Sequence, residues 1–305
     1  MRILVLGAAG QVGTELQALD GRMWEGQPLT VVALPRAAAD LTDPAAVRAA
    51  VAHSQCQAVI NTAAYTAVDQ AESHPDDAFA VNRDGPHHIA EACARAGLPL
   101  VHLSTDYVFD GTHPGAYRED DPPSPINVYG ASKLEGERAV AAALPRHAIL
   151  RTSWVFAAHG RNFVRTMLRL GDERSHLRVV ADQIGCPTAA ADIAAAAATV
   201  AARLADGHDP SLWGVFHYTS AEVTSWHGFA AAIFAERERR TGRPAPRLDA
   251  ITTADFPTPA RRPANSVLDN SRLRECYGIR QPDWRRSLAV ALDQLIDAPH
   301  TANTP

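Results

Sequence analysis

Three glycines that directly follow the first apolar segment place the strongest constraint on the fold of this chain. Residues 3–6 have the pattern of a short β-strand, and Gly7, Gly10 and Gly13 come next in the spacing G-x-x-G-x-x-G. A side chain at Gly7 or Gly10 would keep phosphates away from backbone N–H groups, and one at Gly13 would push the following helix off the strand. The spacing therefore predicts a dinucleotide-binding turn at the start of an α/β sheet.

Short apolar or β-branched segments alternate with segments of helical periodicity in the first half of the chain. The predicted strands are 3–6, 29–34, 58–61, 100–103 and 148–152, and the predicted helices are 11–19, 43–53, 75–96 and 129–143. Strands separated by helices are typical of parallel sheets. We expect an α/β fold, a Rossmann-like doubly wound parallel sheet with a smaller C-terminal substrate-binding domain.

The second half of the chain suggests the domain organisation. Predicted strands at 177–180 and 215–218, with helices at about 189–204 and 225–240, resume the sheet pattern. The proline-rich stretches 110–128 and 243–264 exclude helix, so we expect a loop over the site and a cover over the strand ends. We assign 1–155 and about 176–222 to a dinucleotide-binding domain, about 156–175 and 223–298 to a substrate-binding domain, and 299–305 to a flexible tail.

Composition and charge exclude several classes of protein. With 29 Lys and Arg against 34 Asp and Glu, the net charge is −5, which gives no electrostatic footprint for nucleic acid. The longest uncharged apolar stretch, 193–202, is shorter than the 18 residues or more of a membrane span. Cys56, Cys93, Cys186 and Cys276 form no C-x-x-C pair and the histidines no H-E-x-x-H, so we expect no metal site. The N-terminus lacks signal-peptide features, which favours the cytoplasm.

The end of the second predicted strand should decide which dinucleotide binds. An acidic residue there would bind a ribose 2′-hydroxyl, whereas an arginine would accept a 2′-phosphate. This chain has Arg36 at that position, so we expect NADPH, although NADH could also be accepted. Asp40 and Leu41 are candidates to hold the adenine or ribose. The alternative interpretation of Arg36 is a solvated surface arginine.

A tyrosine and a lysine four residues apart form the candidate catalytic pair. Tyr129 and Lys133 have the pattern Y-x-x-x-K, which places both side chains on one face of a helix. An ammonium nearby, and the cationic nicotinamide of an oxidised cofactor, would lower the phenol pKa towards its working range. Lys133 could also hold the nicotinamide ribose. We expect Tyr129 to act as a general acid or base, although such a pair also occurs on surfaces.

Two hydroxyl side chains end the fourth predicted strand. Substrates bind at the carboxyl ends of strands in doubly wound sheets, and Ser104 and Thr105 lie at that end. We expect Thr105 to donate a hydrogen bond to a substrate carbonyl and Ser104 to pack behind it. The alternative is that these residues only cap the strand.

Seven segments together resemble one family of extended short-chain dehydrogenases/reductases, the dTDP-4-dehydrorhamnose reductases. The glycine and tyrosine motifs alone indicate only the superfamily, in which the G-x-x-G-x-x-G spacing is usual. More specific are Thr-Ala-Val-Asp at 66–69, Ser-Thr-Asp-Tyr-Val-Phe-Asp-Gly at 104–111 and Arg-Pro-x-Asn-Ser at 262–266. The resembling segments are 7–13, 61–69, 104–111, Tyr129 with Lys133, 151–156, 182–188 and 262–269.

The resemblance implies an activity and a set of cofactor contacts. The activity would be NADPH-dependent reduction of the C4 keto group of dTDP-4-dehydro-L-rhamnose to dTDP-L-rhamnose, a precursor of cell-surface polysaccharides. The implied cofactor contacts are Gln11, Val12, Asp40, Leu41, Ala63, Ala64, Tyr65, Tyr129 and Lys133.

The resemblance also implies substrate contacts at Thr105, Asp106 and Trp154. Trp154 is expected to stack on the sugar or base, with a core tryptophan as the alternative. Arg262 and Asn265 follow the second proline-rich stretch and are expected to face the diphosphate, although a surface salt bridge would also explain the arginine. Members of the family form homodimers with Mg²⁺ on acidic side chains, for which Glu15 is a candidate here.

Two other functions remain open at this point. A nucleotide-sugar 4-epimerase shares the glycine turn and the Tyr/Lys pair, but it retains NAD and needs no external reductant. The regulatory subunit of methionine adenosyltransferase resembles these reductases yet serves as a binding partner. The intact Tyr129 and Lys133, and the alanine- and arginine-rich composition, weigh against the binding partner.

Overall fold

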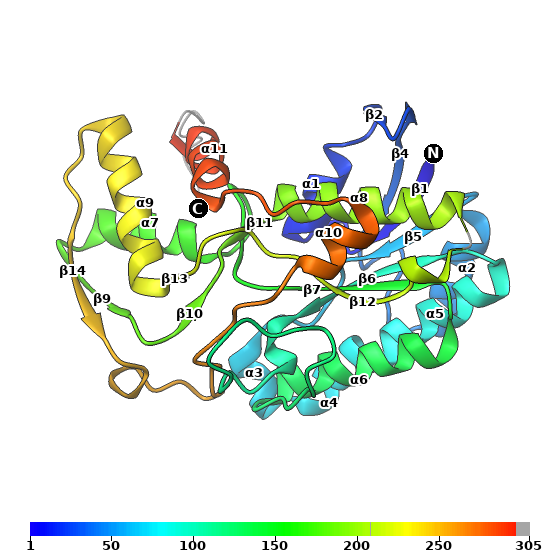
Figure 1. Cartoon of the computed structure of the whole chain (residues 1–305), viewed down its shortest axis with the longest axis horizontal. Helices are drawn as coiled ribbons and strands as arrows, with labels where there is room; N and C mark the ends of the chain where they lie inside the picture. Colours follow the sequence, from blue (N-terminus) through cyan, green and yellow to red (C-terminus); the bar gives the residue numbers. More distant parts are fainter. Residues whose placement is uncertain (208, 297–305) are drawn as a thin grey trace.

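A six-stranded parallel sheet forms the centre of the computed structural model, which describes residues 1–207 and 209–296 (Figure 1). The strands lie in the order β12-β7-β6-β5-β1-β4, and every neighbouring pair is parallel. The chain leaves β1 towards β4 on one side and then continues through β5 on the other, which confirms the predicted doubly wound α/β fold. The bounds are β1 Arg2–Leu6, β4 Thr30–Leu34, β5 Ala58–Asn61, β6 Leu100–Thr105, β7 His147–Thr152 and β12 Gly214–His217.

Helices cover both faces of this sheet. Alternate residues of β1 point to opposite faces, so Ile3 and Val5 belong to one core and Leu4 and Leu6 to the other. One core includes α1 (Gln11–Gln17), α8 (Ala190–Asp206) and α10 (Ser271–Tyr277), and the other includes α2 (Pro44–His53), α5 (Gly85–Ala96) and α6 (Val128–Ala143). Figure 1 shows α1 and α8 above the sheet and α5 and α6 below it.

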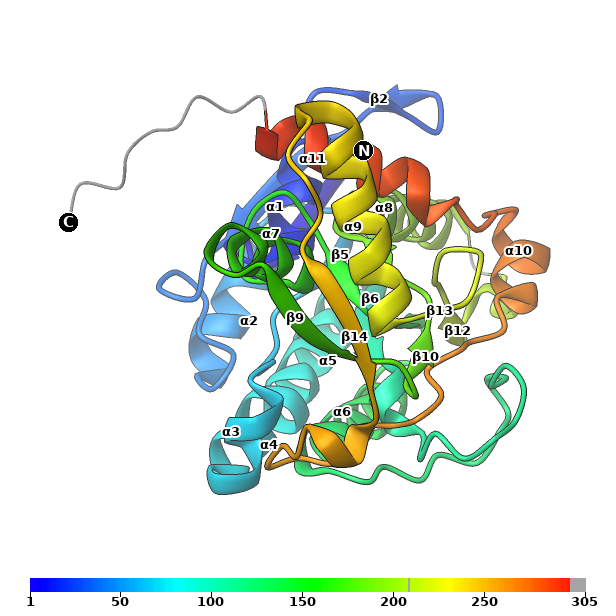
Figure 2. The same ribbon diagram turned by 90° about the vertical axis from the view of Figure 1, so that its left-hand side faces the viewer.

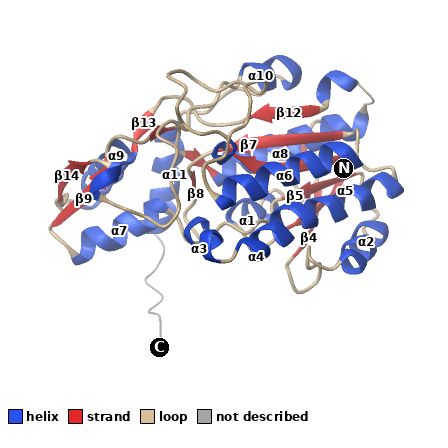
Figure 3. Ribbon diagram, turned by 90° about the horizontal axis from the view of Figure 1, so that it is seen from below, coloured by secondary structure: helices blue, strands red, loops and turns tan. Residues whose placement is uncertain are grey.

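A second, smaller unit lies at the end of the molecule away from the main sheet (Figure 3). Here β9 (His176–Val180) pairs in parallel with β14 (Arg247–Ile251), and both lie against α9 (Trp226–Thr241) in Figure 2. The helices α7 (Phe163–Glu173) and α11 (Trp284–Ile296) complete its aromatic core, which contains Phe156, Phe229, Phe234 and Trp284.

The expectation that the main sheet resumes at 177–180 is wrong. Only β12 joins that sheet, whereas β9 pairs with β14 in the smaller unit. Leu177 and Val179 are buried while His176 and Arg178 are exposed, so β9 is apolar on one face only. An inner strand of a parallel sheet is covered on both faces and cannot carry such an alternation.

The helix predicted at 75–96 is interrupted. It consists of α4 (Pro75–Phe79), a π-helical turn at Ala80–Asp84, and α5, and it is preceded by α3 (Val68–Ser73). Single π-helical turns inside α-helices are often found at functional sites. Here the turn carries the buried Asn82 towards the segment after β5.

Several short elements complete the fold. Strand pairs join β8 to β11 and β10 to β13, a hairpin is formed by β2 and β3, and 3₁₀ turns lie at Asp106–Val108, Pro210–Leu212 and Thr253–Asp255. The pairs comprise β8 Val155–Phe156, β11 Thr188–Ala189, β10 Ile184–Gly185, β13 Thr224–Ser225, β2 Met23–Trp24 and β3 Gln27–Pro28. In the part of the chain that the structure describes, every helix is too short or too polar to cross a bilayer. The predicted tail at 299–305 lies outside the described residues.

Candidate active site

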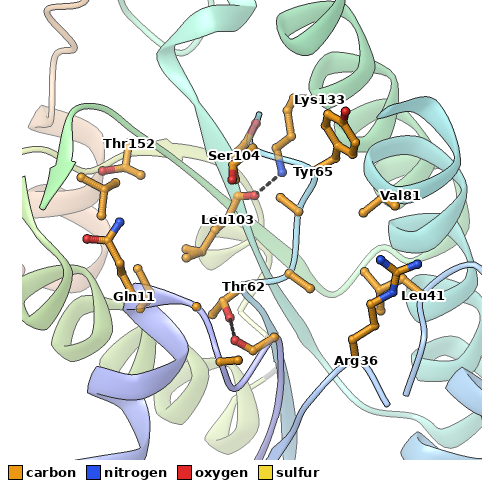
Figure 4. Close-up of a pocket in the computed structure, with 18 of the residues that line it drawn as sticks. Gln11, Arg36, Leu41, Thr62, Tyr65, Val81, Leu103, Ser104, Lys133 and Thr152 are labelled. Atoms are coloured by element: carbon orange, nitrogen blue, oxygen red, sulfur yellow. Dashed lines mark hydrogen bonds between the residues drawn. The ribbon is translucent and has the colours of Figure 1, made fainter. Parts of the chain in front are cut away.

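A cavity of about 420 Å³, the first cavity, opens at the carboxyl ends of β1, β4, β5, β6 and β7 (Figure 4). At this edge the chain stops adding strands on one side of β1 and starts adding them on the other. Ligands of doubly wound sheets bind at such a point. The structure brings most of the predicted cofactor-binding residues to its lining. They are Gly7, Gly10, Gln11, Val12, Arg36, Asp40, Leu41, Ala63, Ala64, Tyr65, Tyr129 and Lys133.

The glycine turn leaves no room for side chains. Gly7 has φ +94°, and a Cβ added there would lie 2.6 Å from the backbone nitrogen of Ala63. A Cβ on Gly13, which lies behind the lining, would lie 2.2 Å from the carbonyl oxygen of Gly7. The turn therefore exposes backbone atoms without side chains to the cavity and packs tightly on its other side. Such a backbone can bind the diphosphate of a dinucleotide.

Arg36 and Asp40 form an ion pair at the rim of the first cavity. Arg36 Nε lies 2.9 Å from Asp40 Oδ2, and the Arg36 side chain is 79% exposed. Hydrogen bonds from the backbone and hydroxyl of Thr42, and then from Arg36, lower the pKa of Asp40 to about 2. The cation predicted to accept a 2′-phosphate is present, but an ionised carboxylate shares it.

Sequence reasoning missed Asn82, which fixes the segment after β5. Its Oδ1 accepts a hydrogen bond from Tyr65 N at 2.8 Å, and its Nδ2 donates to Tyr65 O at 3.0 Å and to Ser132 Oγ at 3.0 Å. The side chain is buried at the π-helical turn. The only sequence signal for these hydrogen bonds is an asparagine within a helix pattern.

The phenol of Tyr129 remains protonated over a wide pH range. Burial raises its pKa to about 12, while the neighbouring Thr105 hydroxyl opposes this change and the Asp106 carboxylate adds to it. In the structure burial dominates this pKa and the opposing group is Thr105, so the lowering expected from Lys133 and a cationic nicotinamide stays a prediction. A protonated phenol can donate its proton, so the arrangement suits a general acid.

Lys133 lies one helical turn beyond Tyr129, buried beneath the first cavity. Its Nζ donates to the carbonyl oxygen of Leu103 at 2.7 Å, as Figure 4 shows, and the residue is 2% exposed. Burial lowers the pKa of Lys133 to about 8, and the negative charge of Glu137 opposes the change. The ammonium is therefore fixed by the strand end and held in its charged form by a carboxylate.

That carboxylate belongs to a buried network beneath the site. Glu137 accepts hydrogen bonds from Arg151 Nε at 2.9 Å and Arg151 Nη2 at 2.7 Å, and also from Ser104 Oγ at 2.5 Å. Both charged side chains are almost fully buried, at 3% and 4% exposure. Tyr129, Lys133 and Glu137 thus share one face of α6, and Ser104 connects this face to β6.

Thr105 and Asp106 lie beside Tyr129 rather than in the lining of the first cavity. Thr105 Oγ1 donates to Asp106 Oδ1 at 3.0 Å and accepts from Tyr107 N at 3.2 Å. Burial raises the pKa of Asp106 to about 6. Ser104, expected to pack behind Thr105, lines the cavity instead, because neighbouring side chains of a strand point to opposite faces.

The Trp154 indole packs against Trp226 and Gly185. Its ring stacks on Trp226 with centroids 3.6 Å apart and planes 10° apart. Gly185 lies so close to the ring that an added Cβ would be 2.7 Å from Cε2. Since Trp226 already occupies one ring face, stacking of Trp154 on a sugar or base stays a prediction, and we expect contact at the indole edge. The residue adopts φ 50°, a strained backbone that is common at functional sites.

A larger second cavity, of about 650 Å³, lies in the smaller unit next to α3. The predicted substrate residue Arg262 lines it, and its Nη2 lies 2.9 Å from Asp69 Oδ2. The walls combine aromatic, aliphatic and cationic side chains, most of which sequence reasoning did not identify. They include Phe163, Met167, Leu170, Arg174, Arg178, Val180, Trp226, Ile251 and Phe256.

The structure uses Asn265 to hold a loop, so it does not bring this residue to either cavity. The Asn265 amide donates to the carbonyl oxygens of His113 and Gly115, both at 2.7 Å. Its Oδ1 accepts from Val267 N at 2.9 Å, and the residue is buried. These bonds fix the loop 110–118 against the segment after the second proline-rich stretch, and both amide hydrogens are already donated.

Within residues 1–207 and 209–296, no three His, Cys, Asp or Glu side chains gather as a metal site. Glu15, the candidate ligand, lies 2.7 Å from His159 Nε2.

Comparisons with known proteins agree with this geometry. The family described as RmlD substrate binding domain matches residues 1–296. The dTDP-4-dehydrorhamnose reductase of Sinorhizobium fredii is 47% identical over 288 residues, which covers 94% of this chain and 95% of the relative. The crystal structure of a dTDP-4-dehydrorhamnose reductase from Clostridium acetobutylicum has a TM-score of 0.87 at 37% identity, covering 97% of this chain and 100% of that one. That of Bacillus anthracis, in complex with NADP, has a TM-score of 0.85 at 35% identity, covering 96% and 99%.

Proposed function

Because the chain belongs to the RmlD substrate binding domain family, we propose that it reduces dTDP-4-dehydro-L-rhamnose to dTDP-L-rhamnose with NADPH. The names of its relatives favour this reaction over the epimerase and the binding partner. The observation that carries the proposal is the Tyr129 phenol in the lining of a cavity whose floor is a bare glycine turn.

The lining of the first cavity fits NADPH. We assign the diphosphate to the turn of Gly7, Gly10 and Gly13, with Gln11 and Val12 beside it. The adenosine end then lies near Arg36, Asp40 and Leu41, and the segment Ala63, Ala64 and Tyr65 lines the path towards Tyr129 and Lys133. When bound, NADPH supplies the hydride that reduces C4 of the sugar.

Tyr129 supplies the proton that the reduction requires at O4. As C4 is reduced, negative charge develops on its oxygen, and the phenol donates its proton there. Thr105 lies beside the same phenol, and its hydroxyl would turn from Asp106 to donate to the carbonyl oxygen and polarise it. Lys133, held by Leu103, lines the same cavity, where its ammonium would bind the ribose hydroxyls of the nicotinamide.

The second cavity is the place for the nucleotide end of the substrate. Its aromatic and aliphatic walls suit a base, and Arg174, Arg178 and Arg262 suit a diphosphate. Trp154 joins the two cavities, because its ring stacks on Trp226 of the second while its chain neighbours Thr152 and Val155 line the first. We assign the sugar to that position.

The proposed reaction is tested with purified protein and added NADPH. With dTDP-4-dehydro-L-rhamnose, we expect one NADPH to be oxidised for each sugar reduced, and slower oxidation with other 4-keto nucleotide sugars. An epimerase would interconvert sugars without consuming NADPH. That result, or equal rates with every 4-keto sugar, would overturn the proposal.

Arg36→Ala is expected to narrow a preference for NADPH over NADH. The cation would pair with the 2′-phosphate, but Asp40 shares it and it is largely exposed, so we expect the ratio of kcat/KM values to fall by roughly fivefold. Arg138→Ala, which removes another exposed arginine, paired with Glu135 on α6, serves as the control. Equal kcat/KM values in the wild type, or an unchanged ratio in the variant, would contradict the assignment.

Trp154→Ala is expected to raise KM for the nucleotide sugar while the Kd for NADPH barely changes. Loss of an edge contact should raise KM about 2- to 10-fold, the size of one hydrogen bond. Loss of the stack on Trp226 should cost about 0.5–1.5 kcal/mol of stability. A stability loss of about 3–5 kcal/mol with unchanged KM would instead make Trp154 a core residue.

The proposal also includes a cellular compartment and an oligomeric state. Cys56, Cys93, Cys186 and Cys276 are free thiols, which suits a reducing compartment, and we propose the cytoplasm. The family resemblance suggests a homodimer, and light scattering of the purified protein measures this directly.

A further inference from the structure

One aromatic side chain is exposed where the fold gives no reason for it. The exposed large apolar residues of the described chain are Met23, Ile184, Val223, Val290 and Phe256, and Phe256 is the only aromatic one. It is 58% exposed and lies at the rim of the second cavity. Exposure of a large ring to water is unfavourable, so a ligand that covers it would be stabilised.

The segment that carries Phe256 is attached on both sides of the ring. Before it, Thr253 donates from its backbone and its hydroxyl to the Asp182 carboxylate, at 2.9 and 2.8 Å. After it, Ala260 N donates to Asp69 Oδ1 at 3.2 Å. In Figure 1 this segment follows β14 and runs along the lower edge of the molecule towards α3. Residues 253–260 thus form a short arch at the second cavity, and this arch holds the Phe256 ring at the rim.

The walls beneath the arch divide into an aromatic part and a cationic part. Phe163 and Trp226 line the cavity and contact each other, with centroids 4.6 Å apart. Arg174 and Arg178 also line it, and within the described residues neither forms a salt bridge. A ligand with a flat ring and a negative charge matches both parts.

We propose that Phe256 covers the base of the nucleotide sugar, with its ring stacked on the base while the cavity arginines hold the diphosphate. The proposal rests on the proposed function, since that function supplies a pyrimidine nucleotide as ligand. It adds that an arch outside the main sheet positions the substrate. Phe256 is then a positioning residue that contributes to substrate binding and leaves NADPH binding unchanged.

The experiment measures binding of dTDP, the part of the substrate that would touch Phe256, by isothermal titration calorimetry. Phe256→Ala is expected to weaken dTDP binding roughly 5- to 150-fold, the range measured when an aromatic partner of a base is removed. Phe256→Tyr should retain wild-type affinity, and Phe256→Leu should not restore it, because leucine keeps apolar area but has no ring face. The Kd for NADPH should be the same in all variants.

The control is Val223→Ala, which removes an apolar side chain of similar exposure, 53%, that is not part of the lining of the second cavity. Unchanged dTDP affinity in Phe256→Ala, or full recovery in Phe256→Leu, would overturn the stacking. A change in oligomeric state with unchanged dTDP affinity would assign Phe256 to contact with a second copy and would also overturn it. If the wild type reduces the sugar, these failures leave the proposed function intact. If it neither reduces the sugar nor binds dTDP, the proposed function itself has failed.

Discussion

Replacement of Tyr129 by phenylalanine is expected to lower kcat by about 100-fold or more, because general acid catalysis typically contributes at least that factor. The phenol is the group placed to protonate O4, and its pKa of about 12 keeps the proton available at neutral pH. The ring itself remains, so the Kd for NADPH should hardly change. Steady-state oxidation of NADPH gives kcat, and quenching of protein fluorescence gives the Kd.

The control for this variant is Tyr107→Phe. Tyr107 packs edge-to-face on Tyr129 with centroids 5.5 Å apart, and both residues are half-buried. Removal of its hydroxyl tests whether any nearby phenol matters. A Tyr129→Phe variant that keeps more than about half of the wild-type kcat would show that another group delivers the proton.

Glu137→Gln should be the most destabilising single change in the network beneath the site. Arg151 would keep a buried charge without its carboxylate, and breaking such a pair typically costs about 3–5 kcal/mol of unfolding free energy. Urea unfolding measures the loss. Glu135→Gln, on the same helix, removes an exposed partner of Arg138 and should cost only about 0–1 kcal/mol.

The same variant gives a second, independent measurement. The Glu137 carboxylate opposes the effect of burial on Lys133, whose pKa is about 8. Without it the pKa falls further, so the ammonium is lost at a lower pH and activity should decline at a lower pH than in the wild type. Equal stability of the Glu137 and Glu135 variants, or an unshifted pH profile, would contradict the account of this network.

The sequence predicts the main sheet well because its strands are apolar on both faces. The strand at Ala58–Asn61 has the predicted bounds, and the others differ by one or two residues. β14 and α7 were not predicted, because β14 lies within a proline-rich stretch and α7 is buried only along a narrow stripe. Strand β9 was placed in the wrong sheet because its partner could not be read from local sequence.

Within the site, the residues of local motifs were the predictable ones. The glycine turn and the Tyr129/Lys133 pair depend on spacing along one segment, and the structure brings both to the first cavity. The bond from Lys133 to Leu103 and the stack of Trp154 on Trp226 join segments far apart in the chain. Their effects on pKa and on exposed ring faces follow from packing, which the sequence alone does not specify.

The most direct test of the proposed reaction follows the hydrogen itself. NADPH carrying deuterium at the transferred position of C4 of the nicotinamide is incubated with the protein and dTDP-4-dehydro-L-rhamnose, and the sugar product is analysed by ¹H NMR and mass spectrometry. The account predicts dTDP-L-rhamnose with one deuterium at C4 of the sugar for each NADPH oxidised. A product sugar without deuterium, or an epimerised sugar formed without oxidation of NADPH, would contradict it.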